Sequence, residues 1–172
     1  MNWSGIKDTL YDWANSDGDT VIWRNQNGPQ PTDNYFALEL ISSESKGQDY
    51  KSFSLNDDNE RTYTGNRDFI INLHYYGTDA FMKVDDKANS LEVLGVQSFL
   101  RSSDIVYVDK GTTTNAPNLY DSDYKEHALN VLKFRAANVI VTESEYFDHV
   151  SISGQVKEGD TVKRTIDINV SI

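Results

Sequence analysis

The feature that most constrains the fold is a run of alternating apolar side chains in residues 68–76, DFIINLHYY. Phe69, Ile71, Leu73 and Tyr75 stand at every second position. Successive side chains of a β-strand point to opposite faces, so a period of two predicts a strand with one continuous apolar side. A strand of this kind needs neighbours that pair with its backbone, and the chain is therefore expected to build a sheet around it.

The same pattern predicts further strands. Residues 35–43, YFALELISS, alternate in this way, and short apolar runs begin at residues 21–23 and 105–110. At the C-terminus, VSISGQV and the alternating apolar residues within 162–172 flank a turn at KEGDT, which predicts a hairpin.

Two long segments are less regular. The Ala and Leu content of residues 126–147 permits a helix, but the Val and Ile residues at 139–141 favour a long strand. The polar stretch between Ser43 and Asn66 has two short alternating patches. It is better explained by a long, protruding hairpin with its tip at NDDNE than by a loop of that length.

Helical spacing occurs in two places. Ile6, Leu10 and Trp13 recur along one face of residues 4–14, with Ser4 as the predicted N-cap. Thr78 is predicted to cap a second helix. That helix has an apolar face of Phe81, Val84, Ala88 and Leu91, and an acidic face of Asp79, Asp85 and Asp86.

The order of these elements predicts an α+β fold for one domain over residues 1–172. It is a mainly antiparallel sheet with two helices packed on one face and a long protruding hairpin. Residues 94–104 fit either a helical or an irregular turn.

The charge and the missing cysteines exclude several classes of function. A net charge of -11 argues against phosphate binding, because phosphate contacts need Lys and Arg. The absence of cysteine excludes disulfides and thiolate metal sites. No apolar run approaches the ~20 residues of a membrane span, and the N-terminus shows no leader, so we expect no membrane and a cytosolic site of synthesis.

No motif for catalysis, a metal or a cofactor is present. Asp17 and Asp19 match only part of a calcium loop and fit a turn better. His74, His127 and His149 lack the spacing of metal ligands. We therefore predict a protein that is not an enzyme, with no catalytic, cofactor-binding or metal-binding residues and no cofactor, although a hydrolase with a pair of carboxylates stays open.

The most unusual segment is residues 21–35, VIWRNQNGPQPTDNY, which turns from a strand into amides and prolines. Pro29 and Pro31 stiffen the backbone, and Asn25, Gln26 and Asn27 supply donors and acceptors without charge. A stiff segment loses little entropy on docking. The segment is therefore either a corner that joins two strands or a protein contact surface, and the two interpretations are compatible.

This segment carries a resemblance to a known family. The pattern Trp-x-Asn-Gln-Asn-x-Pro-x-Pro, followed by RDFIINLHYYGTDAFMKVDDKANSL and IVYVDKG, resembles the neck or tail-terminator proteins of tailed bacteriophages over residues 20–142. The matching positions are Trp23, Asn25, Gln26, Asn27, Pro29 and Pro31.

The resemblance implies a structural subunit of the virion. Such proteins form a ring, commonly a hexamer, that ends the tail tube and joins it to the head-side connector, with a channel through which DNA passes without specific binding. The expected location is the neck or tail of the virion, after assembly in the host cytoplasm. The alternatives are a carbohydrate-binding or adhesion module of the virion and a head-completion (stopper) protein, although two amphipathic helices argue against a lectin-like sandwich.

The excess of acidic side chains suggests a role for several acidic residues in loops. Carboxylates that line a pore repel the phosphates of a passing duplex. The candidates for a position toward the channel or toward a neighbouring ring are Asp57, Asp58, Glu60, Asp121 and Asp123.

Overall fold

The computed structural model describes residues 1–29, 31–52, 56, 60–116, 118–120, 123–143 and 149–171. The helices are α1 (Trp3–Ala14), α2 (Ala80–Ser90) and α3 (Leu94–Arg101). The strands are β1 (Thr20–Trp23), β2 (Tyr35–Ser45), β3 (Tyr50–Lys51), β4 (Glu60–Tyr76), β5 (Ile105–Lys110), β6 (Thr114–Asn115), β7 (Asn118–Tyr120), β8 (Asp123–Lys125), β9 (His127–Glu143), β10 (His149–Glu158) and β11 (Thr161–Ser171).

The chain packs as two compact units. The first contains Met1–Ser52 and Thr62–Ile140, and the second contains Phe53–Arg61 and Val141–Ile172. The expectation of one domain over residues 1–172 stays a prediction. Among the helices of the described residues, none has the length and apolar character needed to cross a bilayer.

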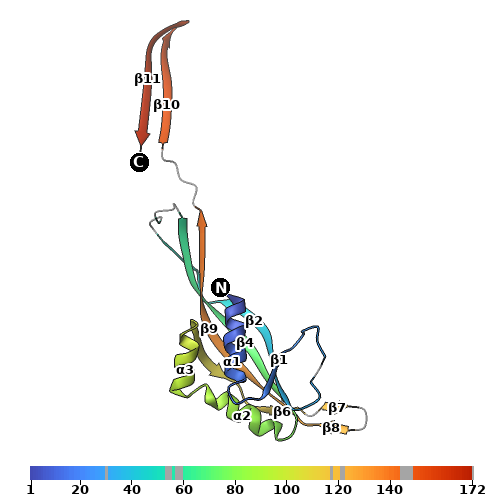
Figure 1. Ribbon diagram of the computed structural model, residues 1–172. Coiled ribbons are helices and arrows are strands. Elements are labelled where there is room, and N and C mark those ends of the chain that lie inside the picture. The colour runs from blue at the N-terminus through green and yellow to red at the C-terminus, as the bar shows by residue number, and fades with distance from the viewer. Residues whose placement is uncertain are drawn as a thin grey trace. The chain divides into compact units, whose positions relative to one another are not determined.

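The predicted α+β class and mainly antiparallel sheet are confirmed. The main sheet has the strand order β1-β2-β4-β9-β5, and in addition β3 pairs with β4 and β6 pairs with β9. The strands β1, β2, β4 and β9 of this sheet are labelled in Figure 1. Residues 127–143 form a strand and not a helix, as the Val and Ile content favoured. The described residues contain three helices instead of two, because residues 94–101 complete a helix of their own.

The pair β1 and β2 departs from the antiparallel pattern. Thr20 lies opposite Tyr35 and Trp23 lies opposite Leu38, so these strands run parallel. Parallel neighbours need a connection that carries the chain back to the starting end of the sheet. Residues 24–34, with their amides and prolines, make that connection.

The main core lies between the helices and one side of the sheet. On β4 it uses alternate residues from Phe69 to Tyr75, as the period of two predicted. The Phe69 ring stacks on Phe134 of β9, with centroids 5.6 Å apart, and meets the edge of Trp3 at 5.5 Å. The buried helix residues of this core are Ile6, Leu10, Trp13, Ala14, Ala80, Val84, Ala88 and Leu100.

Both predicted helix caps are wrong. The Asn2 side chain caps α1 by accepting a hydrogen bond from the backbone N–H of Gly5 at 3.1 Å, so the helix starts before Ser4. At α2 the cap position is Asp79, in the left-handed region with φ 59° and without a capping side-chain bond. The Glu126 carboxylate instead accepts a hydrogen bond from the N–H of Ala80 at 3.3 Å. A tertiary contact thus replaces the local cap.

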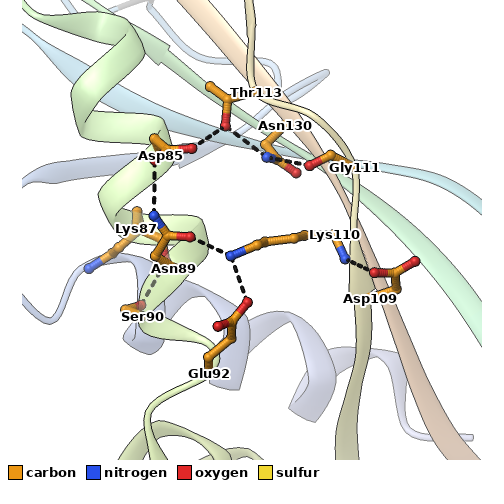
Figure 2. A network of polar contacts seen from close by, with 10 residues as sticks. All are labelled: Asp85, Lys87, Asn89, Ser90, Glu92, Asp109, Lys110, Gly111, Thr113 and Asn130. Carbon is orange, nitrogen blue, oxygen red and sulfur yellow. Dashed lines mark hydrogen bonds and ion pairs between the residues drawn. The ribbon is translucent and has the colours of Figure 1, made fainter.

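A polar network ties α2 to the sheet (Figure 2). Thr113 donates to the Asp85 carboxylate at 2.9 Å, and the buried Asn130 of β9 donates to Thr113 at 2.9 Å. Asn89 donates to Asp85 at 2.9 Å and accepts from Lys110. Asp85, predicted on an acidic face of the helix, therefore serves to hold the helix in place.

The strand β3 pairs with β4, with Tyr50 opposite Thr64. Beyond it, the N–H of Ser52 donates to the carbonyl of Thr62 at 2.9 Å. Residues 57–59 of the predicted tip lie outside the described residues, and a protruding hairpin stays a prediction.

Candidate functional site

The connection between β1 and β2 borders an open cavity of about 300 Å³ on the sheet. Four of the six residues predicted from the sequence line it: Trp23, Asn25, Gln26 and Pro29. Asn27 and Pro31, which belong to the same prediction, are not among the lining residues. The other lining residues are Ile22, Arg24, Gly28, Tyr35, Ala37 and Tyr76. The segment thus serves as a corner and also forms the wall of a cavity.

The floor of the cavity is aromatic. Tyr35 and Tyr76 are 2% and 7% exposed, and their rings stack with centroids 5.0 Å apart. Tyr76 also stacks on His127, at 4.3 Å. The alternation in β4 explains this position, because Tyr76 and His74 point to the side of the strand opposite Phe69. The sequence contained this signal, but the floor was not identified from it, since the strand partners were unknown.

The first turn of the connection is fixed by its backbone. Asn25 has φ 65°, a left-handed conformation that asparagine adopts more readily than most residues. The N–H of Arg24 donates to the carbonyl of Leu38 at 2.8 Å and extends the pairing of β1 with β2. At the far end, a Cβ on Gly77, whose φ is 136°, would lie 2.0 Å from the side-chain oxygen of Asn34. The glycine that ends β4 therefore lets the connection pack closely.

A chain of hydrogen bonds runs beside the cavity. Nδ1 of His127 donates to the carbonyl of Ala116 at 2.8 Å, so in the neutral ring Nε2 accepts from Nδ1 of His74 at 3.0 Å. Nε2 of His74 then accepts from Arg24 Nη1 at 3.2 Å. Arg24 also pairs with Glu39 at 2.9 Å. The two histidines thus link the connection to β4 and β9.

Burial keeps the two histidines of this hydrogen-bond chain neutral. It lowers the pKa of His74 to about 4, and the charge of Arg24 acts in the same direction. Burial likewise lowers the pKa of His127. For Glu39, burial acts to raise the pKa, but the positive charge of Arg24, which pairs with the carboxylate, outweighs burial and holds the pKa below its usual range. The described residues include no group of three or more His, Asp or Glu side chains placed to hold a metal ion.

An ion cluster lies on the same sheet. Asp68 of β4 is 1% exposed and accepts from Nε of Arg135 at 2.6 Å. Lys133 lies 3.2 Å and Lys46 3.8 Å from its carboxylate. The hydrogen bond from Arg135 is the main cause that lowers the pKa of Asp68 to about 2. This buried carboxylate joins β4 to β9, and the sequence pattern did not identify it.

The five acidic candidates are only partly described. Asp57, Asp58 and Asp121 lie outside the described residues. The Glu60 carboxylate, in the second compact unit, accepts from the Asn56 side chain at 2.9 Å. Asp123 starts β8 in the first unit and lies opposite Tyr120. Their proposed role in a channel stays a prediction.

A comparison with known protein families gives a match that covers most of the chain. A family model described as "Phage neck terminator protein" matches residues 4–160. The matched range includes the connection around the cavity, the ion cluster and β10. No curated protein matches the chain.

Proposed function

Because the chain belongs to the phage neck terminator protein family, we propose that it forms a ring that ends the tail tube and joins it to the head-side connector. Membership of the family makes it a structural protein of the bacteriophage virion, at the neck. The ring leaves an axial channel for DNA, and the subunit makes and breaks no covalent bond. The family match over residues 4–160 carries this proposal.

The proposed subunit is one domain that assembles in the host cytoplasm as a hexamer. Its helices pack on one face of the sheet, and its hairpin around residues 56–60 protrudes. Ring closure requires heterologous contacts, in which one surface of a subunit meets a different surface of the next. Because copies with a net charge of -11 repel each other, assembly should strengthen with salt. Mass measurement of the purified chain across salt concentrations tests the ring, and imaging of the particle tests its position. A chain that is monomeric under all conditions, or a particle without it at the neck, would contradict the proposal.

The connection around the cavity is proposed as a contact with a neighbouring virion protein. Aromatic side chains and arginine are enriched at protein interfaces, and this cavity combines Trp23, Arg24 and Gln26 with the two tyrosines of its floor. Asn27 and Pro31 belong to the same proposed surface, outside the cavity. The prolines keep the segment stiff, so that docking costs little entropy.

A charge placed at the cavity should weaken this contact. We expect Gln26→Arg to lower the titre of a phage that depends on the variant by about tenfold or more, because a buried arginine without a partner is costly at an interface. Thr32→Arg is the matched control, since Thr32 is an exposed residue of the same connection that does not line the cavity. Equal titres of both variants, at equal thermal stability, would contradict the role of the cavity.

The acidic candidates are proposed to face the channel or a neighbouring ring. Glu60→Lys and Asp123→Lys, together with reversals at Asp57, Asp58 and Asp121, should leave the subunit folded but slow DNA ejection, because lysines in a pore form ion pairs with phosphates. The rate of ejection from purified particles should then become more sensitive to salt. Normal assembly and normal ejection by the reversed variants would exclude this role.

A further inference from the structure

The hairpin of β10 and β11 has one apolar side that is exposed. Ile152 lies directly opposite Ile168, and residues opposite each other on paired strands share a side of the sheet. Ile152, Ile166 and Ile168 are 58%, 43% and 49% exposed, and Val156, on the same side, is exposed as well. The other side of the hairpin is mostly polar, with Val162 opposite Lys157 near the turn. It carries the opposed pairs Ser153 with Asp167 and Gln155 with Thr165.

A ribbon of this kind is not stable by itself. Two-stranded hairpins are marginal in water, and a third strand or a packed surface is needed to stabilise them. Among the described residues, β10 and β11 form a sheet of two strands only. The four exposed apolar side chains on one side therefore indicate that another surface covers the hairpin in the assembled protein.

The charge of the hairpin favours a second copy of the chain as its partner. Residues 149–171 contain three basic and three acidic side chains, so the whole net charge of -11 lies in the rest of the chain. A neutral element can approach an acidic copy without the repulsion that acidic surfaces experience. Arg164 lies opposite Val156, on the apolar side. It can donate to a carboxylate of an acidic neighbour, whereas a purely apolar partner such as a lipid would leave it unpaired.

The area of the hairpin indicates which kind of assembly such a contact can support. Strands of about ten residues, with a rise of about 3.4 Å per residue and a spacing of about 4.8 Å, present roughly 330 Å² on one side. Covering it buries roughly 650 Å² in total, less than the roughly 1,200 Å² of a stable two-body interface. One such contact is therefore too small to hold two copies together by itself, and it fits a closed ring, in which every subunit takes part in two of them, one with each neighbour.

We propose that the apolar side of the β10–β11 hairpin binds a second copy of this chain, as an arm that each subunit lays on the acidic surface of its neighbour. This inference rests on the proposed ring, and it names the segment that joins the subunits. Arg164 forms an ion pair with that surface, and the three isoleucines and Val156 exclude water from the contact.

The test compares two adjacent residues of β11 on opposite sides of the hairpin. Ile166→Asp places a carboxylate on the apolar side, and Thr165→Asp places the same charge on the polar side. The mass of the full chain is measured by sedimentation over a range of protein and salt concentrations. We expect the wild type and Thr165→Asp to assemble alike, and Ile166→Asp to require at least about tenfold more protein. Ile168→Asp should reproduce this effect, and thermal unfolding checks that each variant is folded.

The possible outcomes separate the two proposals. If the wild type forms a ring and Ile166→Asp assembles equally well, the proposed role of the arm is wrong and the proposed ring is supported. If both assemble alike but only the wild type binds purified tail tubes, the hairpin binds another virion protein and the inference is also wrong. A wild-type chain that stays monomeric at every concentration overturns both the arm and the self-assembled ring.

Discussion

Replacing His74 with leucine is expected to remove most of the acid sensitivity of folding between pH 6.5 and pH 4. The folded protein holds the pKa of His74 at about 4, against an ordinary value of 6.5. Between these values the unfolded chain binds a proton that the folded chain does not, so stability is fully present above pH 6.5 and is lost as the pH falls toward 4. The shift corresponds to roughly 3 kcal/mol of unfolding free energy.

The structure explains why His74 resists protonation. Its Nδ1 donates to His127, and its Nε2 accepts from Arg24 at 3.2 Å. A second proton would remove the acceptor that Arg24 uses and would place two positive charges side by side. Glu39, 3.2 Å from Nε2, opposes this effect only in part. Protonation should therefore loosen the connection from the sheet before the whole domain unfolds.

Urea unfolding at pH 7 and at pH 4.5 measures the effect. The matched control is Asn72→Leu, because Asn72 lies on the same strand and the same side, two residues away, and does not titrate. We expect the control to keep the wild-type loss of stability on acidification, and His74→Leu to lose less. His127 and the carboxylates account for the remaining slope. A wild-type pH dependence in His74→Leu would show that this histidine is not held neutral by the fold.

Phe69→Ala is expected to be the most destabilising change of a single core side chain considered for this protein. The ring is fully buried, stacks on Phe134 and meets the edge of Trp3. Removing a buried phenylalanine costs about 3–5 kcal/mol, because transfer free energy is lost and a cavity remains. Phe69 touches residues from α1 and β9, so both elements should lose support together.

The neighbouring residue provides the control for this prediction. Ile70 lies next to Phe69 but points to the other side of β4, where it is half-buried. Ile70→Ala should cost about half as much or less, because less area is removed from contact. Chemical denaturation of both variants gives the two free energies. Equal losses of unfolding free energy would mean that the two sides of β4 are equally packed, which would contradict the core described above.

The sequence predicted the elements better than their contacts. The period of two in residues 68–76 predicted which side of β4 is buried, and Phe69, Ile71 and Leu73 do lie in the core. The C-terminal hairpin and the strand at 127–143 were also predicted from side-chain pattern. The caps at Ser4 and Thr78 were wrong, because several polar residues near each helix start could serve equally well.

For the candidate site, too, the sequence predicted local features but not the contacts between distant residues. The stiffness and polarity of residues 24–31 could be seen in the sequence, and four of the six predicted residues line the cavity. The aromatic floor could not be predicted, because Tyr35 and Tyr76 come together only when β2 pairs with β4. His74 and His127 are 53 positions apart and meet only through β9.

By itself, the sequence determined the long strands, the helices α1 and α2 and the stiff connection, since these depend on side-chain periodicity, backbone preference and proline within a few residues. Only the tertiary structure decided that β1 and β2 run parallel, that a cavity lies under their connection, and that Asp68 meets Arg135 across 67 positions. These features depend on strand register and on burial. Both arise from the free energy of packing the whole chain, which no local pattern contains.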